Sequence, residues 1–319
     1  MLISGKKEDA EFAEEVALAT QLTLKAVPSP IQGAKILAAE DVSIILADVS
    51  SQEQYTAFET AVHESVGLFS DKINSNAIHF VSSEDLGAVS YLIQSPLFGH
   101  LVRRDSERPR VSGKHYGRIV KATLSERSFG LGRLLKPECK IQTIKLAVSS
   151  QKQDAVEAVR AYLIAAKFQS RMAAVIANAV DELVMNAIYD APVDELGKQL
   201  LAATSRATVL KLEGKSSVEL HVGFDGDYAA ISAVDLYGSL DKTKLLNYIS
   251  RIYTQEEYKV KTNVAGAGIG LATVFRSGGS FFFVSESGVQ TEVTVFFKRT
   301  DNFKEFRDQF RFISTQFYF

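Results

Sequence analysis

Three glycines at alternate positions open an apolar stretch in the second half of the chain. Residues 264–275 read VAGAGIGLATVF, with Gly266, Gly268 and Gly270 followed by Leu271. Glycines at this spacing before a helix let backbone N–H groups approach a phosphate, because the first amides of a helix attract anions. Two common phosphate loops do not fit, since the preceding QEEYKVKTN is polar rather than strand-like and no GK[ST] is present. The stretch therefore predicts a phosphate site of another architecture.

A carboxylate and a carboxamide lie one turn apart in a long predicted helix. The stretch DELVMNA, residues 181–187, contains Glu182 and Asn186, whose spacing of four places them on one helical face. Such a pair can supply a general base and an oxygen ligand for Mg²⁺, which takes one or two protein ligands besides phosphates and waters. Alone, the pair is more often the polar edge of an ordinary helix.

An aspartate ends a predicted strand in the stretch SAVDLYGSL, residues 232–240. Asp235 follows alternating apolar residues and leads into Gly238 and Ser239, so its carboxylate is expected where the strand passes into a loop. A lone aspartate at such a place is usually a turn former or a cap. It can instead accept a hydrogen bond from a purine amino group if the phosphate site lies nearby.

The pattern from residue 141 onward predicts an α+β domain that positions these groups. IQTIKLAV alternates like a strand, and helices come mostly first while antiparallel hairpins come mostly later. Two helices and two hairpin turns are expected: helices 152–167 and 170–190, and turns at Asp225-Gly226 and Ser287-Gly288.

Residues 1–104 alternate short apolar runs with helical patterns. The expected strands are MLIS, LTLKAV, VSIILADV, NAIHFV and GHLVRR, with helices between them. This alternation implies parallel pairing through right-handed crossovers. The first domain is therefore expected to be a doubly wound α/β domain.

Two further segments border the second domain. Residues 105–140 combine a surplus of Lys and Arg with scattered Gly and Pro, which is typical of a solvated basic linker containing a helix or two. The alternative is a docking segment for an acidic partner or nucleic acid, which the scarcity of aromatics disfavours. In the tail, residues 301–319, the pattern places four apolar residues on one helical face: Phe303, Phe306, Phe310 and Ile313. They predict a helix packed on the sheet, or else an interface with a second protomer or a partner protein.

The composition is that of an ordinary globular protein. The 319 residues are 46% hydrophobic and 23% charged, with a net charge of -2, which gives no general attraction to nucleic acid. The single cysteine, Cys139, excludes an intramolecular disulfide and favours a reducing, cytoplasmic setting. The first residues soon become charged, unlike a secretory signal, and no apolar run approaches the roughly 20 residues expected of a membrane span.

Four segments, taken in order, resemble motifs of the histidine-kinase-like ATPases, the GHKL or Bergerat-fold superfamily. ELVMNA resembles the N-box, VDLYGSL the G1-box, GAGIGLATVF the G2-box and QTEVTVFF the closing strand. The resemblance covers residues 141–300. It implies an α+β Bergerat fold, an α/β sandwich, that binds ATP and Mg²⁺.

The same resemblance implies roles for individual residues. Glu182 matches the acidic residue proposed as general base, and Asn186 matches the asparagine that binds both nucleotide and Mg²⁺. Asp235 matches the aspartate that accepts from the adenine amino group, and the residues between the G1 and G2 segments resemble the lid of the ATP site. The other implied nucleotide-binding residues are Gly238, Gly266, Gly268, Gly270, Leu271 and Thr291.

Three positions depart from the family pattern. Tyr237 and Ser239 replace glycines of the G1 segment, and Tyr189 stands where a basic residue commonly follows the N-box asparagine. These changes are compatible with nucleotide binding and leave phosphotransfer open. No histidine has the surroundings of a sensor-kinase phosphoacceptor, so the domain is most similar to the anti-sigma-factor serine kinases, which phosphorylate an antagonist protein.

Residues 1–104 resemble a two-component receiver domain with a flavodoxin-like fold. Asp48 ends the third expected strand, where the phosphoacceptor of that family lies. The acidic pair that would hold Mg²⁺ is replaced by Gly5 and Lys6, and Arg103 stands in place of the lysine of the last strand. We therefore expect a degenerate receiver that serves for binding rather than for phosphorylation at Asp48.

The combined expectation is a cytoplasmic signal-transduction protein whose partner is a signalling or antagonist protein. Its most concrete activity would be transfer of the γ-phosphoryl group of Mg-ATP to a serine, with Glu182 as base. The alternative is a non-catalytic module in which bound nucleotide changes the lid and hence partner binding. A gyrase- or repair-type ATPase is disfavoured because no transducer domain follows residue 300. The sequence leaves a homodimer possible and the partner open.

Overall fold

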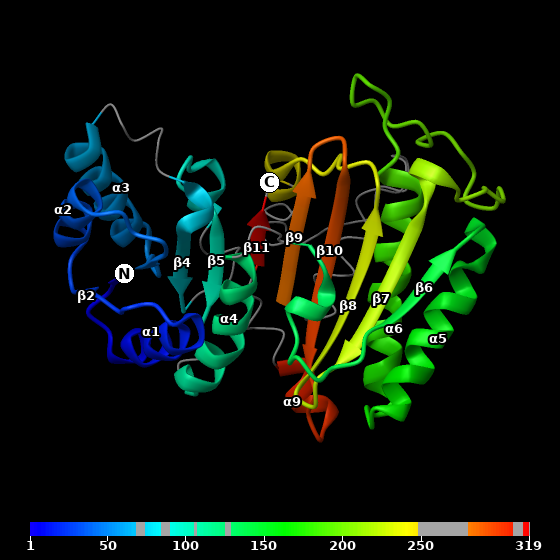
Figure 1. Cartoon of the computed structure of the whole chain (residues 1–319), viewed down its shortest axis with the longest axis horizontal. Helices are drawn as coiled ribbons and strands as arrows, with labels where there is room; N and C mark the ends of the chain where they lie inside the picture. The colour runs from blue at the N-terminus through cyan, green and yellow to red at the C-terminus, as the bar shows by residue number, and fades with distance from the viewer. Residues whose placement is uncertain are drawn as a thin grey trace. The chain divides into compact units, whose positions relative to one another are not determined.

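In the computed structural model of this chain, two compact units are distinguished. Unit 1 comprises Met1–Ser128 with Ser314–Tyr318, and unit 2 comprises Phe129–Ile313 with Phe319. Figure 1 shows both units. The described residues are 1–67, 74–83, 90–104, 107–124, 129–247, 280–308 and 315–318.

Unit 1 is built on a mainly parallel sheet. Five parallel strands follow the order β2-β1-β3-β4-β5, one of the common orders of doubly wound sheets, and a sixth strand, β11, runs antiparallel to β5. The first five fall where the alternating pattern predicts strands. Their bounds are β1 Leu2–Ile3, β2 Ala26–Val27, β3 Ile45–Asp48, β4 Ile78–Ser82, β5 His100–Arg103 and β11 Thr315–Tyr318.

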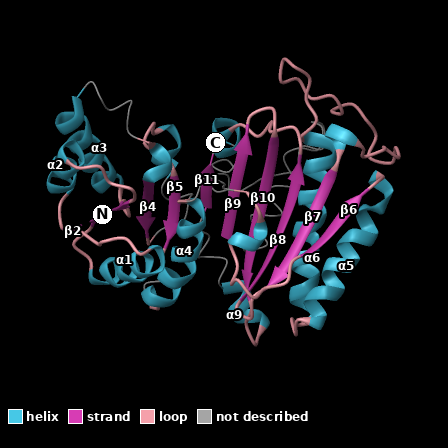
Figure 2. Ribbon diagram, in the orientation of Figure 1, coloured by secondary structure: helices cyan, strands magenta, loops and turns pink. Residues whose placement is uncertain are grey.

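Four helices cover this sheet in two pairs, α1 with α4 and α2 with α3, which Figure 2 shows on opposite faces. Serine side chains begin two of them: Ser29 caps α2, and Ser51 forms a capping box with Gln54 at the start of α3. Helix α1 buries Phe12 against Tyr116 of α4, with ring centroids 5.7 Å apart. The bounds are α1 Lys7–Thr20, α2 Pro30–Ala39, α3 Gln52–Val66 and α4 Pro109–Thr123.

The stretch 105–140 differs from the linker expected from its charge. Helix α4 packs on α1 inside unit 1, and residues 129–141 belong to unit 2. Two glycines of α4 allow the close approach: a Cβ at Gly113 would lie 2.6 Å from a backbone oxygen of α1, and one at Gly117 would lie 2.7 Å from a side-chain carbon of α1. Part of the basic surplus therefore lies on this packed helix, where Arg110, Lys114 and Lys121 are exposed while its apolar face is buried.

Unit 2 contains an antiparallel sheet in the order β9-β10-β8-β7-β6. The two hairpins turn at Asp225-Gly226 and Ser287-Gly288, as the sequence predicts, and Gly226 and Gly288 both have a positive φ. The strand bounds are β6 Gln142–Leu146, β7 Val218–Phe224, β8 Tyr228–Asp235, β9 Ser280–Glu286 and β10 Gln290–Lys298.

Helices α5, Lys152–Ala165, and α6, Ser170–Met185, cover one face of this sheet (Figure 2). Residues 129–141 cross the opposite face, where Leu131, Leu134 and Leu135 are buried. The apolar stripe predicted for α6 is fully buried and includes Met172 and Ile176. Unit 2 is therefore layered around its sheet, with α6 as its central helix.

Helix α6 with its continuation, Ser170–Asp190, is long and apolar enough to pass for a membrane span by length and composition, contrary to the expectation that no run approaches one. Within the fold, 61% of its most apolar window is buried. The central helix of a packed domain meets the same criterion, and this burial accounts for its apolar character.

The tail differs from the single helix expected for residues 301–319. A short helix, α9 (Phe303–Asp308), packs on α6, with Phe306 buried against Phe297 and the Arg171 guanidinium 4.0 Å from the centre of the Phe303 ring. Strand β11 then adds to the sheet of unit 1. Phe310 and Ile313 lie outside the described residues.

Candidate functional site

Unit 2 contains a cavity of about 580 Å³ between the end of α6 and strands β8, β9 and β10. This volume lies within the usual range for small-molecule sites, about 300 to 1,000 Å³. Three of the residues singled out from the sequence line it together: Asn186 from α6, Asp235 from β8 and Thr291 from β10. The antiparallel register brings the last two together, since Thr291 lies directly opposite Asp235.

Asp235 is the most deeply buried acidic group of this cavity. It is 6% exposed, and its carboxylate accepts a hydrogen bond from the backbone N–H of Tyr237 at 2.9 Å. Burial raises the pKa of Asp235 to about 6, although the backbone N–H groups of Tyr237 and Gly238 and the Thr291 hydroxyl favour the charged form. A buried carboxylate in an apolar wall is a strong acceptor for a donor group of a ligand.

The opposite wall comes from the end of α6, where the helix widens into a π-helical turn over Asn186–Asp190. The N–H of Ala191 donates to the Asn186 carbonyl at 2.9 Å, which closes this wider turn. Such turns often occur at functional sites. The widened turn brings both Asn186 and Asp190 to the cavity.

Glu182 is half-buried one turn before Asn186 and is not among the described residues that line the cavity. Burial, followed by the charge of Asp181, raises the pKa of Glu182, whereas Arg206 and Lys152 lower it. Lys152 forms an ion pair with Asp181. The structure thus places Glu182 beside the site rather than in its wall.

The turn after β8 explains two departures from the family pattern. The Tyr237 ring is buried away from the cavity lining, and its hydroxyl lies 3.0 Å from the Ser216 hydroxyl. Ser239 lines the cavity, but its hydroxyl donates to the Ala191 carbonyl at 2.7 Å. Neither side chain therefore has to block a ligand beside Asp235.

Gly238 shapes this turn rather than lining the cavity. Its φ is +58°, and a Cβ there would lie 1.9 Å from the backbone oxygen of Glu286. Only glycine fits both the left-handed conformation and this close approach.

The third departure, Tyr189, is also buried, and its hydroxyl donates to the Arg206 carbonyl at 3.2 Å. Arg206 belongs to a long irregular segment, residues 191–213, that follows α6. The same segment contributes Val193 and Gln199 to the cavity lining. Sequence reasoning missed this contribution because the segment carries no recognisable motif.

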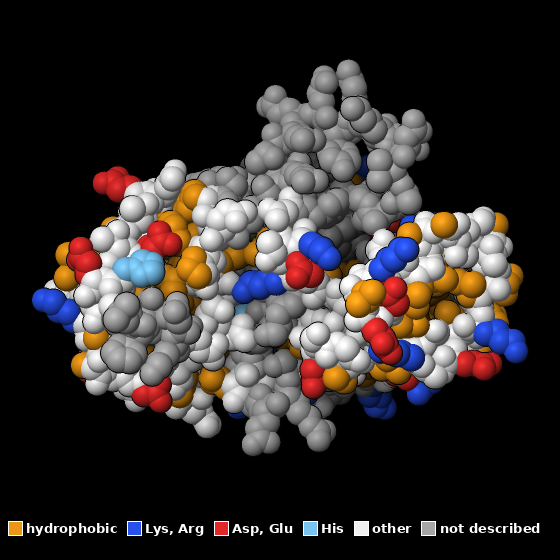
Figure 3. Space-filling model, turned by 90° about the horizontal axis from the view of Figure 1, so that it is seen from above, with side chains coloured by type: hydrophobic (Ala, Val, Ile, Leu, Met, Phe, Trp, Pro, Cys, Tyr) orange, Lys and Arg blue, Asp and Glu red, His pale blue; other side chains and the backbone are white. Residues whose placement is uncertain are grey.

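Residues 191–213 also expose apolar side chains. Leu196 is 93% exposed at the tip of a turn, and Leu200 and Val209 are exposed as well. Figure 3 shows hydrophobic, basic and acidic side chains interspersed on the right-hand part of the molecule seen from above. This surface therefore has no field of a single sign.

Several predicted residues lie outside the described part of the chain. They are Gly266, Gly268, Gly270 and Leu271. Among the residues that the structure describes, no group of three His, Cys, Asp or Glu side chains could hold a metal ion. Any metal at this site would therefore depend on other ligands, such as Asn186 and the phosphates of a nucleotide.

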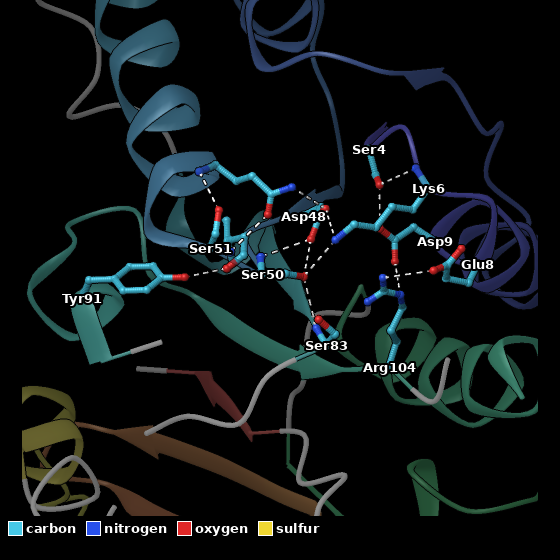
Figure 4. Close-up of polar contacts among 12 residues, drawn as sticks. Ser4, Lys6, Glu8, Asp9, Asp48, Ser50, Ser51, Ser83, Tyr91 and Arg104 are labelled. Carbon is cyan, nitrogen blue, oxygen red and sulfur yellow. Dashed lines mark hydrogen bonds and ion pairs between the residues drawn. The ribbon is translucent and has the colours of Figure 1, made fainter. Parts of the chain in front are cut away.

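In unit 1, Asp48 lies at the carboxyl edge of the parallel sheet, where doubly wound domains commonly bind ligands (Figure 4). The Lys6 ammonium is 2.7 Å from one Asp48 oxygen, which also accepts from Gln54 at 3.1 Å. The other oxygen accepts from the Ser50 hydroxyl at 2.6 Å and the Ser50 backbone N–H at 3.1 Å. Both oxygens of Asp48 are thus satisfied within the fold.

A second ion pair lies beside it at the same edge. Asp9 and Arg104 are both almost fully buried and form an ion pair, and the Ser4 hydroxyl donates to Asp9 at 2.6 Å. Figure 4 shows the two pairs side by side. The acidic groups of this edge are therefore paired within the fold, Asp48 with Lys6, and Asp9 and Glu8 with Arg104. The sequence alone did not indicate these pairs.

No family model matches the chain, and no curated protein does. Among solved structures, a chain of the SiaB-SiaC complex from Pseudomonas aeruginosa is similar, with 16% sequence identity and a TM-score of 0.33. The match covers 49% of this chain and 88% of that chain. At this level the likeness identifies no family.

Proposed function

We propose that unit 2 is a GHKL-type domain that binds an adenine nucleotide in the cavity beside Asp235, within a signal-transduction protein. The observation that carries this proposal is the buried Asp235 carboxylate opposite Thr291, in a cavity whose other wall is formed by Asn186. These residues are distant in sequence, and they match the family's base-side and metal-side positions. Their meeting in one cavity supports the assignment.

The described residues fit such a ligand. Asp235 can accept a hydrogen bond from the adenine amino group, while the Thr291 hydroxyl lies beside it on the next strand. The lining also includes Ala233, Phe283 and Val293, which suit the faces of a flat base. The base would thus be held by one polar contact and an apolar wall.

Asn186 is the described residue best placed to hold Mg²⁺, through its carboxamide oxygen. When bound, the ion would neutralise charge on the phosphates and help to orient them. Glu182 lies one turn away, and burial raises the pKa of its carboxyl group, which suits a group that takes up a proton. We therefore propose a serine kinase of the anti-sigma type as the more specific activity, with a signalling protein as substrate.

The nucleotide site is tested by dye-monitored melting of the full chain with Mg-ATP, Mg-ADP and Mg-GTP. We expect adenine nucleotides to raise the melting temperature because they bind only the folded state. Asp235→Asn should abolish this shift, whereas Asp227→Asn, in the exposed β7–β8 turn, should retain it. Gly268→Val tests the glycine stretch in the same assay. Absence of a shift with every adenine nucleotide would refute the proposal.

Phosphotransfer is tested separately with radiolabelled ATP. We expect transfer to a serine of a partner protein, with loss of label in Glu182→Ala. If the protein binds ATP but neither hydrolyses it nor labels a partner, the site belongs to a nucleotide-gated binding module. The half-buried position of Glu182 outside the described cavity lining favours this second candidate.

For unit 1, we propose a degenerate receiver-like binding domain. The supporting observation is the Lys6 ammonium on Asp48, at the edge where a receiver would place Mg²⁺. Incubation with acetyl phosphate and Mg²⁺ should leave unit 1 unlabelled. Label that is lost in Asp48→Asn would show that the site still accepts a phosphoryl group.

A further inference from the structure

Arg206 is held close to the cavity although it lies far from α6 in sequence. One of its guanidinium nitrogens is 3.8 Å from a carboxylate oxygen of Asp190, and Asp190 lines the cavity. The guanidinium carbon lies 5.2 Å from the centre of the Tyr189 ring, over its face. Tyr189 in turn donates its hydroxyl hydrogen to the Arg206 carbonyl. Side chain and backbone of Arg206 thus both contact the π-helical turn.

The guanidinium still has donors to offer. An arginine carries five N–H donors, and the distance of 3.8 Å to Asp190 is an ion pair rather than a hydrogen bond. Within the described part of the chain, the Arg206 guanidinium makes no hydrogen bond. Its side chain is 39% exposed, so it can turn toward a ligand.

The charges that line the cavity are mostly negative, so an anion needs an additional cation in order to bind there. The described lining has three carboxylates, on Asp190, Asp235 and Asp241, against one ammonium, on Lys244. A polyphosphate placed near Asn186 would face Asp190 directly. A cation that moves from Asp190 to the phosphates would offset this repulsion by its own attraction and by charge-assisted hydrogen bonds.

We propose that Arg206 is the arginine that binds the phosphate chain of the ligand, and that it exchanges its contact with Asp190 for one with the phosphates. Tyr189 stands where the family commonly has a basic residue, and its ring lies against the Arg206 guanidinium, which can supply the charge that the tyrosine lacks. This inference rests on the proposed nucleotide site. It assigns to Arg206 the contact with the phosphates, which a nucleotide has and a nucleoside lacks. Its ligand class is a nucleoside di- or triphosphate.

The experiment compares adenosine, ADP, ATP and tripolyphosphate by calorimetry on the full chain, with Mg²⁺ and with EDTA. The variants are Arg206→Gln, Asp190→Asn and their combination. Arg160→Gln is the matched control, because Arg160 forms an exposed ion pair with Glu157 on α5. Arg206→Gln leaves the backbone carbonyl that accepts from Tyr189 in place, and unchanged circular dichroism and melting of the free protein verify its fold.

We expect Arg206→Gln to weaken ATP and ADP binding about ten- to a hundredfold and to leave adenosine binding unchanged. Asp190→Asn should strengthen ATP binding when Arg206 is present, because Arg206 no longer has to leave Asp190 in order to contact the phosphates. In the Arg206→Gln background the same substitution should strengthen ATP binding less, because no arginine is bound to Asp190 there. A merely structural role of Arg206 would instead weaken adenosine and ATP equally. That result, or unchanged ATP binding, would overturn the inference.

The same data separate this inference from the proposed function. If adenosine binds, and Arg206→Gln changes the affinities for adenosine and ATP equally, the nucleotide site is supported and the proposed role of Arg206 is refuted. If adenosine does not bind but tripolyphosphate binds only with Arg206 present, the anion site stands and the adenine site fails. If none of the four compounds binds, both are overturned.

Discussion

The buried imidazole of His79 should make unit 1 sensitive to mild acid. His79 lies in β4 and is 2% exposed, with its Nδ1 atom 2.5 Å from the Tyr116 hydroxyl and its ring 4.4 Å from that of His100. Burial, followed by the charge of the N-terminus, lowers the pKa of His79 from 6.5 to about 3. The folded state therefore keeps this ring neutral where the unfolded chain binds a proton.

The sign and size of the effect follow from linkage. Because the folded pKa lies below the unfolded value, stability is complete above pH 6.5 and declines as the pH falls from 6.5 toward about 3. One pKa unit corresponds to about 1.4 kcal/mol, so lowering the pH from about 7.5 to about 5 should remove about 2 kcal/mol of stability through His79. Full burial leaves no solvent screening to reduce this figure.

The assay is hydrogen exchange of the β4 amides, Ile78–Ser82, which reports the opening free energy of unit 1 without requiring the whole chain to unfold in one step. His79→Gln keeps a polar side chain and should remove about 2 kcal/mol of the pH dependence. The exposed His63→Gln serves as control. An equal pH dependence in parent and His79→Gln, or an imidazole that titrates near 6.5 by NMR, would refute the reasoning.

Three further outcomes are expected in stability and binding measurements. In denaturant unfolding, Gly238→Ala should destabilise unit 2 by about 1 to 2 kcal/mol because of the left-handed φ, and by about 1 to 3 kcal/mol more because its Cβ would overlap the Glu286 backbone oxygen. Gly226→Ala has open space around it and should show only the cost of the left-handed φ. Gly117→Ala should separate α4 from α1 and lower the protection of α1 amides in hydrogen exchange; unchanged protection would contradict the tight packing. Adenosine, which carries no phosphate, should bind about tenfold more tightly at pH 7 than at pH 5, because Asp235 with a pKa of about 6 must be ionised to accept from the base. In calorimetry, Asp235→Asn should show no adenosine binding at either pH.

Local patterns were sufficient to predict much of the secondary structure. Alternating apolar residues and Asx-Gly or Ser-Gly turns indicated the hairpins of unit 2, because a hairpin is specified by neighbouring residues. The stripe of α6 indicated a central helix for the same reason. The order of Glu182, Asn186 and Asp235 along the chain also suggested that they belong to one site.

The tertiary structure decided how these groups are used. It placed Asn186, Asp235 and Thr291 in one cavity and left Glu182 outside its described lining, because a π-helical turn and a strand register set these positions. Neither the π-helical turn nor the strand register can be predicted from the spacing of residues in the sequence.

The ion pairs of unit 1 and the place of Arg206 likewise depend on long-range packing. Lys6 meets Asp48 only because β1 and β3 are neighbours in the sheet, and Arg206 meets Asp190 only because residues 191–213 fold back on α6. The sequence by itself determined the elements and the candidate polar groups, since both are local properties. The fold determined which charges face one another, since that depends on contacts between residues far apart in the chain.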